Sequence, residues 1–150
     1  MSSRANVDDE YNFITEICGD VFTTRYSLGH CVSADFKMGK GIARAFKEMF
    51  GNVNYLRNSR TQPGGLAVIP MNGRYVYYLV TKRKYYHKPT LASLRSALTA
   101  MRDHALENGI SHVAMPRIGT GLDRLPWKLV KRIIRDVFHG MGIQIVIYYL

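Results

Sequence analysis

The stretch Met115-Pro116-Arg117-Ile118-Gly119-Thr120-Gly121-Leu122-Asp123-Arg124-Leu125-Pro126-Trp127 is typical of a strand, a glycine loop and the start of a helix. The apolar run at residues 112–115 predicts a buried strand. Pro126 suits the first helical turn, where no backbone donor is needed. Apolar residues then recur at helical spacing, at Trp127, Val130, Ile134 and Val137.

In the loop Gly119-Thr120-Gly121, the two glycines have no Cβ atoms that would block a ligand from approaching the backbone amides. Such amides, next to the positive end of a helix dipole, can bind phosphate. Asp123 stands at the edge of this loop, where a carboxylate would repel phosphate unless it serves a ribose hydroxyl or a proton transfer. The alternative is a tight turn in which Asp123 caps the helix, and the GxG pattern alone favours that turn.

Another glycine loop, the first in chain order, is Met38-Gly39-Lys40-Gly41, which follows a short apolar strand at residues 28–33 and runs directly into a helix that Gly51 ends. Two loops of this kind can grip a diphosphate from both sides. No Walker spacing is present, and the first loop lacks the G-x-G-x-x-G spacing of dinucleotide dehydrogenases. The predicted apolar face of this helix consists of Ile42, Ala45, Phe46, Met49 and Phe50.

Two further strand ends carry polar side chains. A strand at residues 13–18 ends at Gly19-Asp20, and Asp20 can accept a hydrogen bond from an amino group such as that of adenine. Its alternative is an exposed turn aspartate, which the sequence alone favours. Residues 66–70 and 75–81, joined by Asn72-Gly73, predict an antiparallel hairpin.

Lys82 follows that hairpin and opens a cationic loop at residues 82–89. Crowded by Arg83 and Lys84 and partly desolvated, Lys82 could lose its proton and act as a nucleophile, or it could contact phosphate. The alternative is a solvated surface loop, which spacing alone favours. Thr90 is then expected to cap a helix whose apolar face consists of Leu91, Leu94, Leu98, Met101 and Ala105.

The last helix, at about residues 126–139, precedes a final strand at residues 143–150, whose end can line a site. The order of elements predicts an α/β fold with a mixed sheet and helices packed on it. The last helix also carries a basic stripe beside its apolar face, formed by Lys128, Lys131, Arg132 and Arg135.

The composition, 47% hydrophobic and 21% charged over 150 residues, is that of one ordinary globular domain. We expect a flexible tail at residues 1–11 and the domain at residues 12–150. The net charge of +10 indicates a polyanionic partner or ligand. No apolar run approaches the ~18 residues of a spanning helix, and no signal-peptide core is present. Cys18 and Cys31 are too few for a disulfide framework or a zinc site and are expected to be buried in an intracellular protein.

Taken together, five blocks of sequence resemble a macrodomain, and within that superfamily the terminal ADP-ribose protein glycohydrolase branch. The similarity covers about residues 12–150. Ser33 and Ala34 stand where many other branches carry asparagines, a departure shared with this branch that argues against mechanisms needing those asparagines. The blocks are Gly19-Asp20-Val21-Phe22, His30-Cys31-Val32-Ser33, Met38-Gly39-Lys40-Gly41-Ile42-Ala43, Tyr77-Tyr78-Leu79-Val80-Thr81-Lys82 and Pro116-Arg117-Ile118-Gly119-Thr120-Gly121-Leu122-Asp123.

The resemblance implies a single macrodomain in which a mixed, mainly parallel β-sheet is sandwiched between helices. It assigns Lys82 to the family's nucleophilic lysine and Asp123 to its acid/base aspartate. It assigns Asp20 and Val21 to adenine, and Leu150 to the closure of the adenine side. The other implied ligand contacts are Ser33, the first phosphate loop with Gly39, Gly41 and Ile42, and the second with Arg117, Ile118, Gly119, Thr120, Gly121 and Leu122.

The implied activity is hydrolysis of mono-ADP-ribose or terminal ADP-ribose from protein glutamate or aspartate, through a lysyl-ADP-ribose intermediate, with deacylation of O-acyl-ADP-ribose as a related reaction. The resemblance implies no metal or other cofactor. Expected partners are ADP-ribose and ADP-ribosylated proteins, with no membrane, for a monomer in the nucleus or cytoplasm. Two alternatives stay open: a module that binds ADP-ribose without cleaving it, and a poly(ADP-ribose) or RNA binder that uses the basic stripe.

Overall fold

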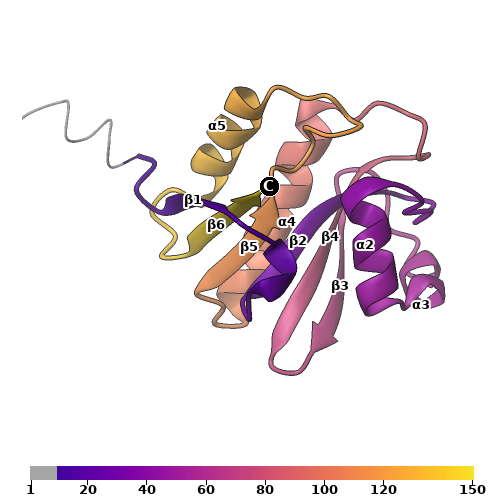
Figure 1. The fold of residues 1–150 in the computed structure, drawn as a ribbon, viewed down its shortest axis with the longest axis horizontal. Coiled ribbons are helices and arrows are strands. Elements are labelled where there is room, and N and C mark those ends of the chain that lie inside the picture. Colours follow the sequence, from indigo (N-terminus) through magenta and orange to yellow (C-terminus); the bar gives the residue numbers. More distant parts are fainter. Residues whose placement is uncertain (1–9) are drawn as a thin grey trace, which may run out of the picture.

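The computed structural model describes residues 10–150, which form a six-stranded sheet between two layers of helices (Figure 1). The sheet order is β1-β6-β5-β2-β4-β3. Only the β3–β4 pair is antiparallel, so the predicted mixed, mainly parallel sheet is confirmed. The strands are β1 (Ile14–Cys18), β2 (Ser27–Ser33), β3 (Leu66–Met71), β4 (Arg74–Lys82), β5 (His112–Pro116) and β6 (Gln144–Tyr149).

The β3–β4 hairpin follows directly from its sequence. Asn72 and Gly73 have φ values of 49° and 85°, the left-handed conformation that a two-residue hairpin turn with strand-like twist requires. The predicted antiparallel pairing and its turn are confirmed, with Met71 opposite Arg74. This hairpin brings Lys82 to the end of β4, beside Ser33 at the end of β2.

Helices α4 (Leu91–Glu107) and α5 (Trp127–Phe138) cover one face of the sheet, and helices α2 (Gly41–Phe50) and α3 (Val53–Asn58) lie on the other (Figure 1). A 3-10 helix, η1 (Val21–Thr23), also packs on the second face. Successive residues of β4 alternate between the two cores, with Tyr77 toward α4 and Tyr78 toward α2.

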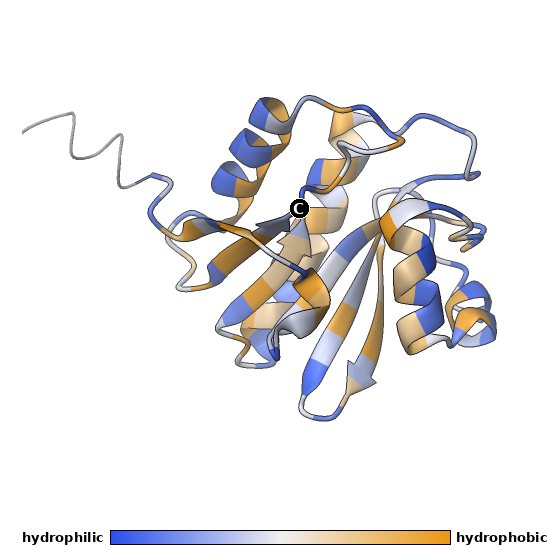
Figure 2. Ribbon diagram, in the orientation of Figure 1, coloured by the Kyte–Doolittle hydropathy of each residue, from blue (hydrophilic) through white to orange (hydrophobic). Residues whose placement is uncertain are grey.

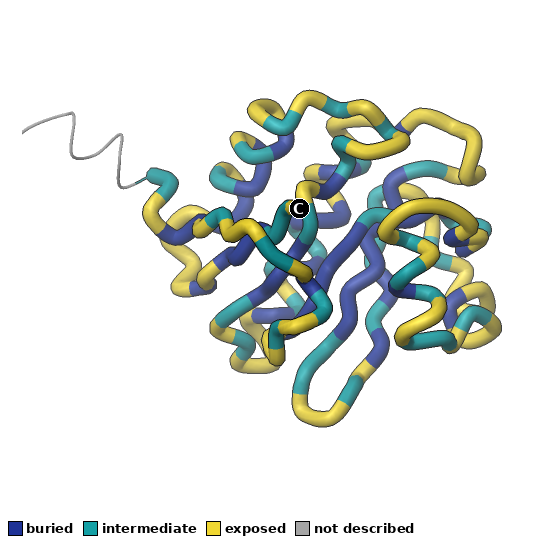
Figure 3. Tube along the Cα trace, viewed as in Figure 1, coloured by how far each residue is buried: buried dark blue, intermediate teal, exposed yellow. Residues whose placement is uncertain are grey.

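The two cores make the strands mostly apolar and buried, while the loops at the strand ends are exposed (Figures 2 and 3). Such strands are expected for a parallel sheet covered on both faces. Among residues 10–150, no helix is long and apolar enough to cross a membrane.

Thr90 caps α4 as predicted, since its hydroxyl accepts the backbone N–H of Ser93 at 3.0 Å. Leu91, however, is exposed, because the first turn of α4 extends past the packed part of the helix. Pro126 is the N-cap residue of α5 and not a residue of its first turn, so that helix begins one residue later than predicted.

The prediction for α2 was wrong in part. Phe46 is buried, but Ile42 and Met49 are 43% and 58% exposed. The buried side of α2 is narrow and packs on two rings: Phe22, which lies 4.7 Å from Phe46 and 6.3 Å from Phe50, and His30, which lies 3.7 Å from Phe46. The elements α3 and η1 were not predicted, since segments this short carry no helical period.

Two expectations near the N-terminus also need correction. Cys18, expected to be buried, is exposed, because β1 is an edge strand and its end faces outward. Of the predicted tail at residues 1–11, residues 1–9 lie outside the described part. Glu10 accepts a charged hydrogen bond from Arg135 at 3.3 Å, and the Tyr11 ring lies 5.3 Å from the same guanidinium. Glu10 and Tyr11 therefore pack on α5 with the domain.

Candidate functional site

A cleft of about 980 Å³ opens at the carboxyl ends of the parallel strands. Ligands of open α/β sheets bind at this edge, and the volume is that of a site for a nucleotide-sized ligand. All the residues that the sequence assigned to a site line this one cleft: Asp20, Val21, Ser33, Gly39, Gly41, Ile42, Lys82, Arg117, Ile118, Gly119, Thr120, Gly121, Leu122, Asp123 and Leu150.

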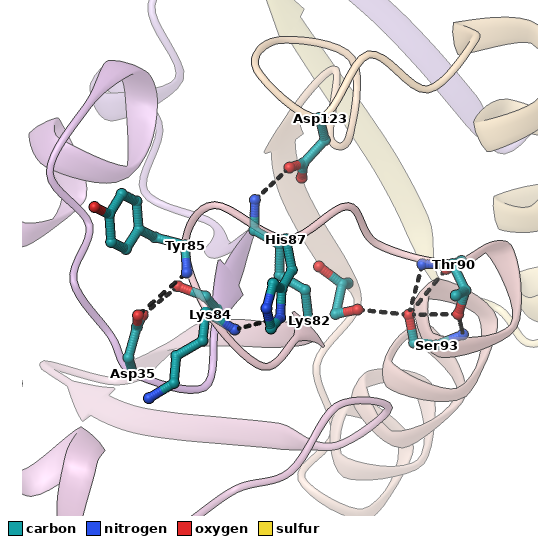
Figure 4. Close-up of polar contacts among 10 residues, drawn as sticks. Asp35, Lys82, Lys84, Tyr85, His87, Thr90, Ser93 and Asp123 are labelled. Atoms are coloured by element: carbon teal, nitrogen blue, oxygen red, sulfur yellow. Dashed lines mark hydrogen bonds and ion pairs between the residues drawn. The ribbon is translucent and has the colours of Figure 1, made fainter.

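Lys82 and Asp123 form an ion pair inside the cleft (Figure 4). The Lys82 Nζ atom lies 2.6 Å from Asp123 Oδ1, and the two side chains are only 13% and 15% exposed. Lys82 comes from the end of β4 and Asp123 from the loop after β5, so the fold joins residues 41 positions apart. At this distance the carboxylate can accept a proton from the ammonium group, which would leave an amine nucleophile.

Cys31 lies near this pair but does not compete with it as a nucleophile. Its pKa is raised above the ordinary range, mainly by burial and also by the negative charge of Asp123. A thiol in such surroundings stays protonated, and a protonated thiol is a poor nucleophile. Of these two groups, Lys82 is the one that could become a nucleophile, once its ammonium group has lost a proton.

The first glycine loop runs directly into α2, as predicted. Gly41 is the first residue of the helix, and Lys40 caps it without a side-chain hydrogen bond. The first N–H groups of a helix have no intrahelical partners, so they are available to an anion at the cleft. Phe36 and Met38 precede this loop with φ values of 48° and 45°, and the burial of both side chains maintains this strained backbone.

The second glycine loop is shaped by contacts within residues 117–125. Gly119 has a φ of +73°, and the Leu125 N–H donates to its carbonyl at 2.7 Å. The Thr120 hydroxyl donates to the Arg117 carbonyl at 2.6 Å. Helix α5 begins only at Trp127, so this loop does not adjoin the helix terminus, contrary to the prediction.

Asp123 does not cap α5, which decides against the alternative that the spacing favoured. Its side chain pairs with Lys82, and the capping position belongs to Pro126. The backbone explains the difference: Arg124, with a φ of 57°, reverses the chain between Asp123 and the helix. The carboxylate therefore faces the cleft and not the helix terminus.

Asp20 lines the cleft from the position just before η1, where it is the N-cap residue. One oxygen of its carboxylate accepts the Phe22 N–H at 2.9 Å, which caps η1. The side chain is exposed, so the second oxygen remains available to a hydrogen-bond donor on a ligand. The adjacent Val21 is buried and supplies an apolar wall of the cleft.

The Arg117 side chain is held by residues of β1 and β6. It donates to Glu16 at 3.1 Å, and its guanidinium carbon lies 4.3 Å from the centre of the Tyr149 ring. Glu16 also accepts from Trp127 at 3.1 Å and from Lys131 at 2.9 Å. Burial raises the pKa of Glu16, but these cationic and hydrogen-bond partners outweigh burial and lower it, so the carboxylate stays charged.

Ser33 and Asp35 connect the end of β2 to the loop after β4. The Ser33 hydroxyl donates to Asp35, so it is already oriented before a ligand arrives. The Asp35 carboxylate also accepts a hydrogen bond from the Tyr85 N–H at 3.1 Å (Figure 4). It accepts another from the Lys37 N–H at 3.2 Å. Burial raises the pKa of Asp35, but the three hydrogen bonds and nearby Lys84 outweigh burial and lower it.

Sequence reasoning missed His30 as a residue of the cleft wall. The His30 ring is fully buried and stacks on Phe46 with ring centres 3.7 Å apart, and within residues 10–150 neither of its nitrogens has a hydrogen-bond partner. Burial lowers its pKa from 6.5 to about 3, so the imidazole is neutral. A histidine inside the apolar strand of residues 28–33 was the available signal. Lys37, Tyr85 and Tyr86 were also missed as lining residues.

The chain matches the family model described as Macro domain over residues 30–134. It is 47% identical to the ADP-ribose glycohydrolase OARD1 of Bos taurus and 46% identical to that of Homo sapiens, each over the full length of both chains.

A solved structure, Thermosipho africanus DarTG in complex with ADP-ribose, has the same fold with a TM-score of 0.82 at 20% identity. The match covers 93% of this chain and 42% of that one. The family model spans most of the sheet and both glycine loops, and the two mammalian relatives extend the similarity to both ends. The chain therefore belongs to the Macro domain family.

Proposed function

We propose that this protein is an ADP-ribosyl-acceptor hydrolase that removes mono-ADP-ribose or terminal ADP-ribose from protein glutamate or aspartate. The observation that carries the proposal is the 2.6 Å pair of Lys82 and Asp123 within a cleft that two glycine loops border. The names of the two mammalian relatives, ADP-ribose glycohydrolase, support the same class of reaction.

The proposed binding mode follows the cleft from end to end. The free carboxylate oxygen of Asp20 accepts a hydrogen bond from the amino group of adenine. The N–H groups at the start of α2 and in the second glycine loop bind the diphosphate, since helix termini and glycine loops favour anions. The distal ribose then lies at the Lys82 end, with its C1″ atom next to the ammonium group.

The first chemical step transfers a proton and exchanges one bond. Lys82 gives a proton to Asp123, its Nζ atom attacks C1″, and the bond between C1″ and the acceptor carboxylate oxygen breaks. The acceptor leaves as a carboxylate with the bonding electrons. The product is a lysyl-ADP-ribose intermediate, which divides one difficult displacement into two easier steps.

The second step restores the enzyme. Asp123 first releases to solvent the proton that it took from Lys82. It then removes a proton from water, the water oxygen attacks C1″, and the bond between C1″ and Lys82 Nζ breaks. The lysine nitrogen keeps the bonding electrons and takes up the proton, so free ADP-ribose leaves and the ion pair forms again. None of these steps routes a proton or an electron pair through a group other than Lys82, Asp123, water and the substrate. O-acyl-ADP-ribose, another ester of the same ribose, is a second substrate class for this cleft.

Two alternative functions are less well supported by the structure. A binding module without catalysis would need no buried lysine–aspartate pair, and such a pair is present. A poly(ADP-ribose) or RNA binder would use the basic stripe of α5. Half of that stripe is neutralised, because Lys131 pairs with Glu16 and Arg135 pairs with Asp136 and Glu10. The stripe therefore supports polyanion binding less well than the cleft supports hydrolysis.

The experiment is incubation with a protein that carries glutamate-linked ADP-ribose, followed by mass spectrometry of the substrate and of the enzyme. We expect loss of the ADP-ribosyl mass from the substrate and a transient ADP-ribosyl mass on the peptide containing Lys82. Asp20→Ala should reduce ADP-ribose affinity, measured by calorimetry, by about tenfold, the usual cost of a charge-assisted hydrogen bond. Binding of ADP-ribose with no release from any acceptor would leave only the non-catalytic module.

A further inference from the structure

The loop at residues 83–88 follows the proposed nucleophile directly and is exposed along its length. Tyr85 and Tyr86 line the cleft, while Arg83, Lys84 and Lys88 are exposed and lie outside its lining. In the part of the chain that the structure describes, none of these three cations forms an ion pair. Lys84 lies close enough to Asp35 to lower the pKa of that carboxyl, but it does not pair with it. The loop therefore presents a cationic surface to an anionic partner.

Hydrogen bonds through Asp35 connect this loop to the segment before the first glycine loop. The Tyr85 N–H donates to Asp35 Oδ2 (Figure 4). Asp35 Oδ1 accepts a hydrogen bond from the N–H of Lys37, in the segment before the first glycine loop. Within the loop, the Lys84 N–H donates to His87 Nδ1 at 3.3 Å. The loop therefore keeps one position relative to the cleft.

The far side of the loop is fixed by the start of α4. The Ser93 hydroxyl donates to the Thr81 carbonyl at 2.7 Å, just before Lys82, and Ser93 and Thr90 form a capping box (Figure 4). The loop thus lies between two anchored points. A surface held in this way loses little conformational entropy when a partner binds.

In the proposed reaction, the acceptor leaves from C1″ at the Lys82 end of the cleft, so the acceptor chain must pass beside residues 83–88. We propose that this loop is a docking surface for an acidic segment that flanks the modified carboxylate of the acceptor protein. The inference rests on the proposed function and names its substrate class: acidic protein segments with an ADP-ribosylated glutamate or aspartate.

The tyrosines of the loop favour an acidic peptide over a single-stranded nucleic acid. Nucleic-acid binding by such a loop depends on aromatic faces that are free for base stacking. The Lys37 ammonium covers one face of Tyr85 at 4.4 Å, and Tyr86 meets the Tyr85 ring edge to face at 86°. The remaining feature of the loop is charge, which matches carboxylates.

The test uses two peptides that carry one glutamate-linked ADP-ribose, flanked either by aspartate and glutamate or by serine and glycine. Affinities are measured with the Lys82→Ala variant, so that no substrate is consumed, and kcat/KM is measured with the wild type. We expect the acidic peptide to be preferred in both assays, less so at high salt. Arg83→Glu with Lys84→Glu should reduce that preference by about tenfold, since two weak surface attractions become repulsions. Free ADP-ribose affinity should stay unchanged.

The matched control reverses two exposed charges on α5, Lys128→Glu with Arg132→Glu. It changes the net charge by the same amount as the Arg83/Lys84 reversal and should leave the preference for the acidic peptide unchanged. Asp35→Asn gives an independent readout. Its amide still accepts from Ser33 and Lys37 but presents a donor to the Tyr85 N–H, so amide hydrogen exchange at Tyr85 should accelerate. Asp35→Asn removes a negative charge beside the loop, so electrostatics alone predicts a stronger preference for the acidic peptide. If the hydrogen bond to Tyr85 is what holds the loop in place, its loss predicts a weaker preference.

The proposal is overturned if the Arg83/Lys84 reversal leaves the preference intact, if the α5 control abolishes it equally, or if Asp35→Asn strengthens it. It is also overturned if a single-stranded oligonucleotide of equal charge displaces the modified peptide better than an acidic peptide does, and if the Arg83/Lys84 reversal abolishes that displacement. Failure of the proposed function has a different signature: the wild type would release no ADP-ribose from either peptide, while the affinities of the Lys82→Ala variant would still test the loop.

Discussion

At the scale of single residues, the pairing of Lys82 with Asp123 decides which of several candidate side chains can act. A neighbouring thiol is kept protonated, and a neighbouring histidine is kept neutral by burial. The ion pair itself holds a potential amine and a proton acceptor 2.6 Å apart. Different roles for the two partners should give different defects when each is removed.

Lys82→Ala should bind ADP-ribose with nearly unchanged affinity and release it from modified glutamate more slowly by on the order of 10³-fold or more, because the nucleophile is gone. Asp123→Ala should slow the second step more than the first and accumulate enzyme with an ADP-ribosyl mass at Lys82. Single-turnover release and intact-protein mass spectrometry measure both effects, with Arg83→Ala as the adjacent exposed control. Near-normal turnover by Lys82→Ala would mean that Asp123 activates water directly.

His30 should make folding stability depend on pH. Burial lowers its pKa from 6.5 to about 3, so between these values the unfolded chain binds a proton that the folded chain does not. This contribution to stability is full above pH 6.5 and declines as the pH falls toward 3, by about 1.4 kcal/mol per pH unit. His30→Phe, which preserves the stack on Phe46, should flatten that decline in urea-unfolding experiments at pH 7, 6 and 5. The same change at exposed His139 is the control, and equal slopes for wild type and His30→Phe would contradict the assignment.

At the scale of elements, the two glycine loops reach the cleft by different means. The first relies on the start of α2, where helix N–H groups are free. The second relies on a local fold in which Gly119 has a left-handed backbone and receives a hydrogen bond from Leu125. The second loop should therefore be the more sensitive to a single added methyl group.

Gly119→Ala combines a strained φ of +73° with a Cβ atom only 3.0 Å from the end of the Leu125 side chain, so either that side chain or the loop must give by a few tenths of an ångström. We expect about tenfold weaker ADP-ribose binding and a stability loss of about 1 kcal/mol from backbone strain. Gly142→Ala is the matched control, because it has the same φ of +73° with no heavy atom within 4 Å of the added Cβ and lies outside the cleft. Calorimetry and thermal unfolding should show strain in both variants and lost affinity only in the first. Equal affinities would remove Gly119 from the phosphate site.

At the scale of the whole molecule, the net charge of +10 is unevenly available. On α5, Lys131 and Arg135 are held by carboxylates, while Lys128 and Arg132 are exposed. Around the cleft, the cations of the loop at residues 83–88 have no such partners among the described residues. Long-range attraction of a polyanion should therefore come more from the cleft side than from α5.

Lys128→Glu with Arg132→Glu should leave ADP-ribose release unchanged and weaken RNA or poly(ADP-ribose) binding only modestly, reducing the slope of log affinity against log salt by no more than about 2. Filter binding at several salt concentrations measures that slope. A larger loss would show that the α5 stripe, despite its ion pairs, is the main polyanion surface; an unchanged slope would show that it serves only solubility.

The sequence by itself determined the fold class, most elements and the composition of the site. The β3–β4 hairpin depends on two residues that suit its turn, the glycine loops on residues without Cβ atoms, and the strands on continuous apolar runs. These are local properties, and local patterns report them. The sequence also identified Asp20, Lys82 and Asp123 as polar residues at strand ends. Local spacing alone favoured structural roles for them, namely an exposed turn, a solvated loop and a helix cap, and only the resemblance to macrodomains assigned them to a site.

Only the tertiary structure decided which of these residues meet. Lys82 and Asp123 are 41 positions apart, and their contact depends on the parallel order β5-β2-β4, which no local pattern encodes. The exposure of Ile42 and Met49 depends on where α2 crosses the sheet, and the burial of His30 depends on Phe46 packing over it. Hydrophobic periodicity indicates that a face is apolar, whereas the position of neighbouring elements determines whether that face is covered by the core or lines a cleft.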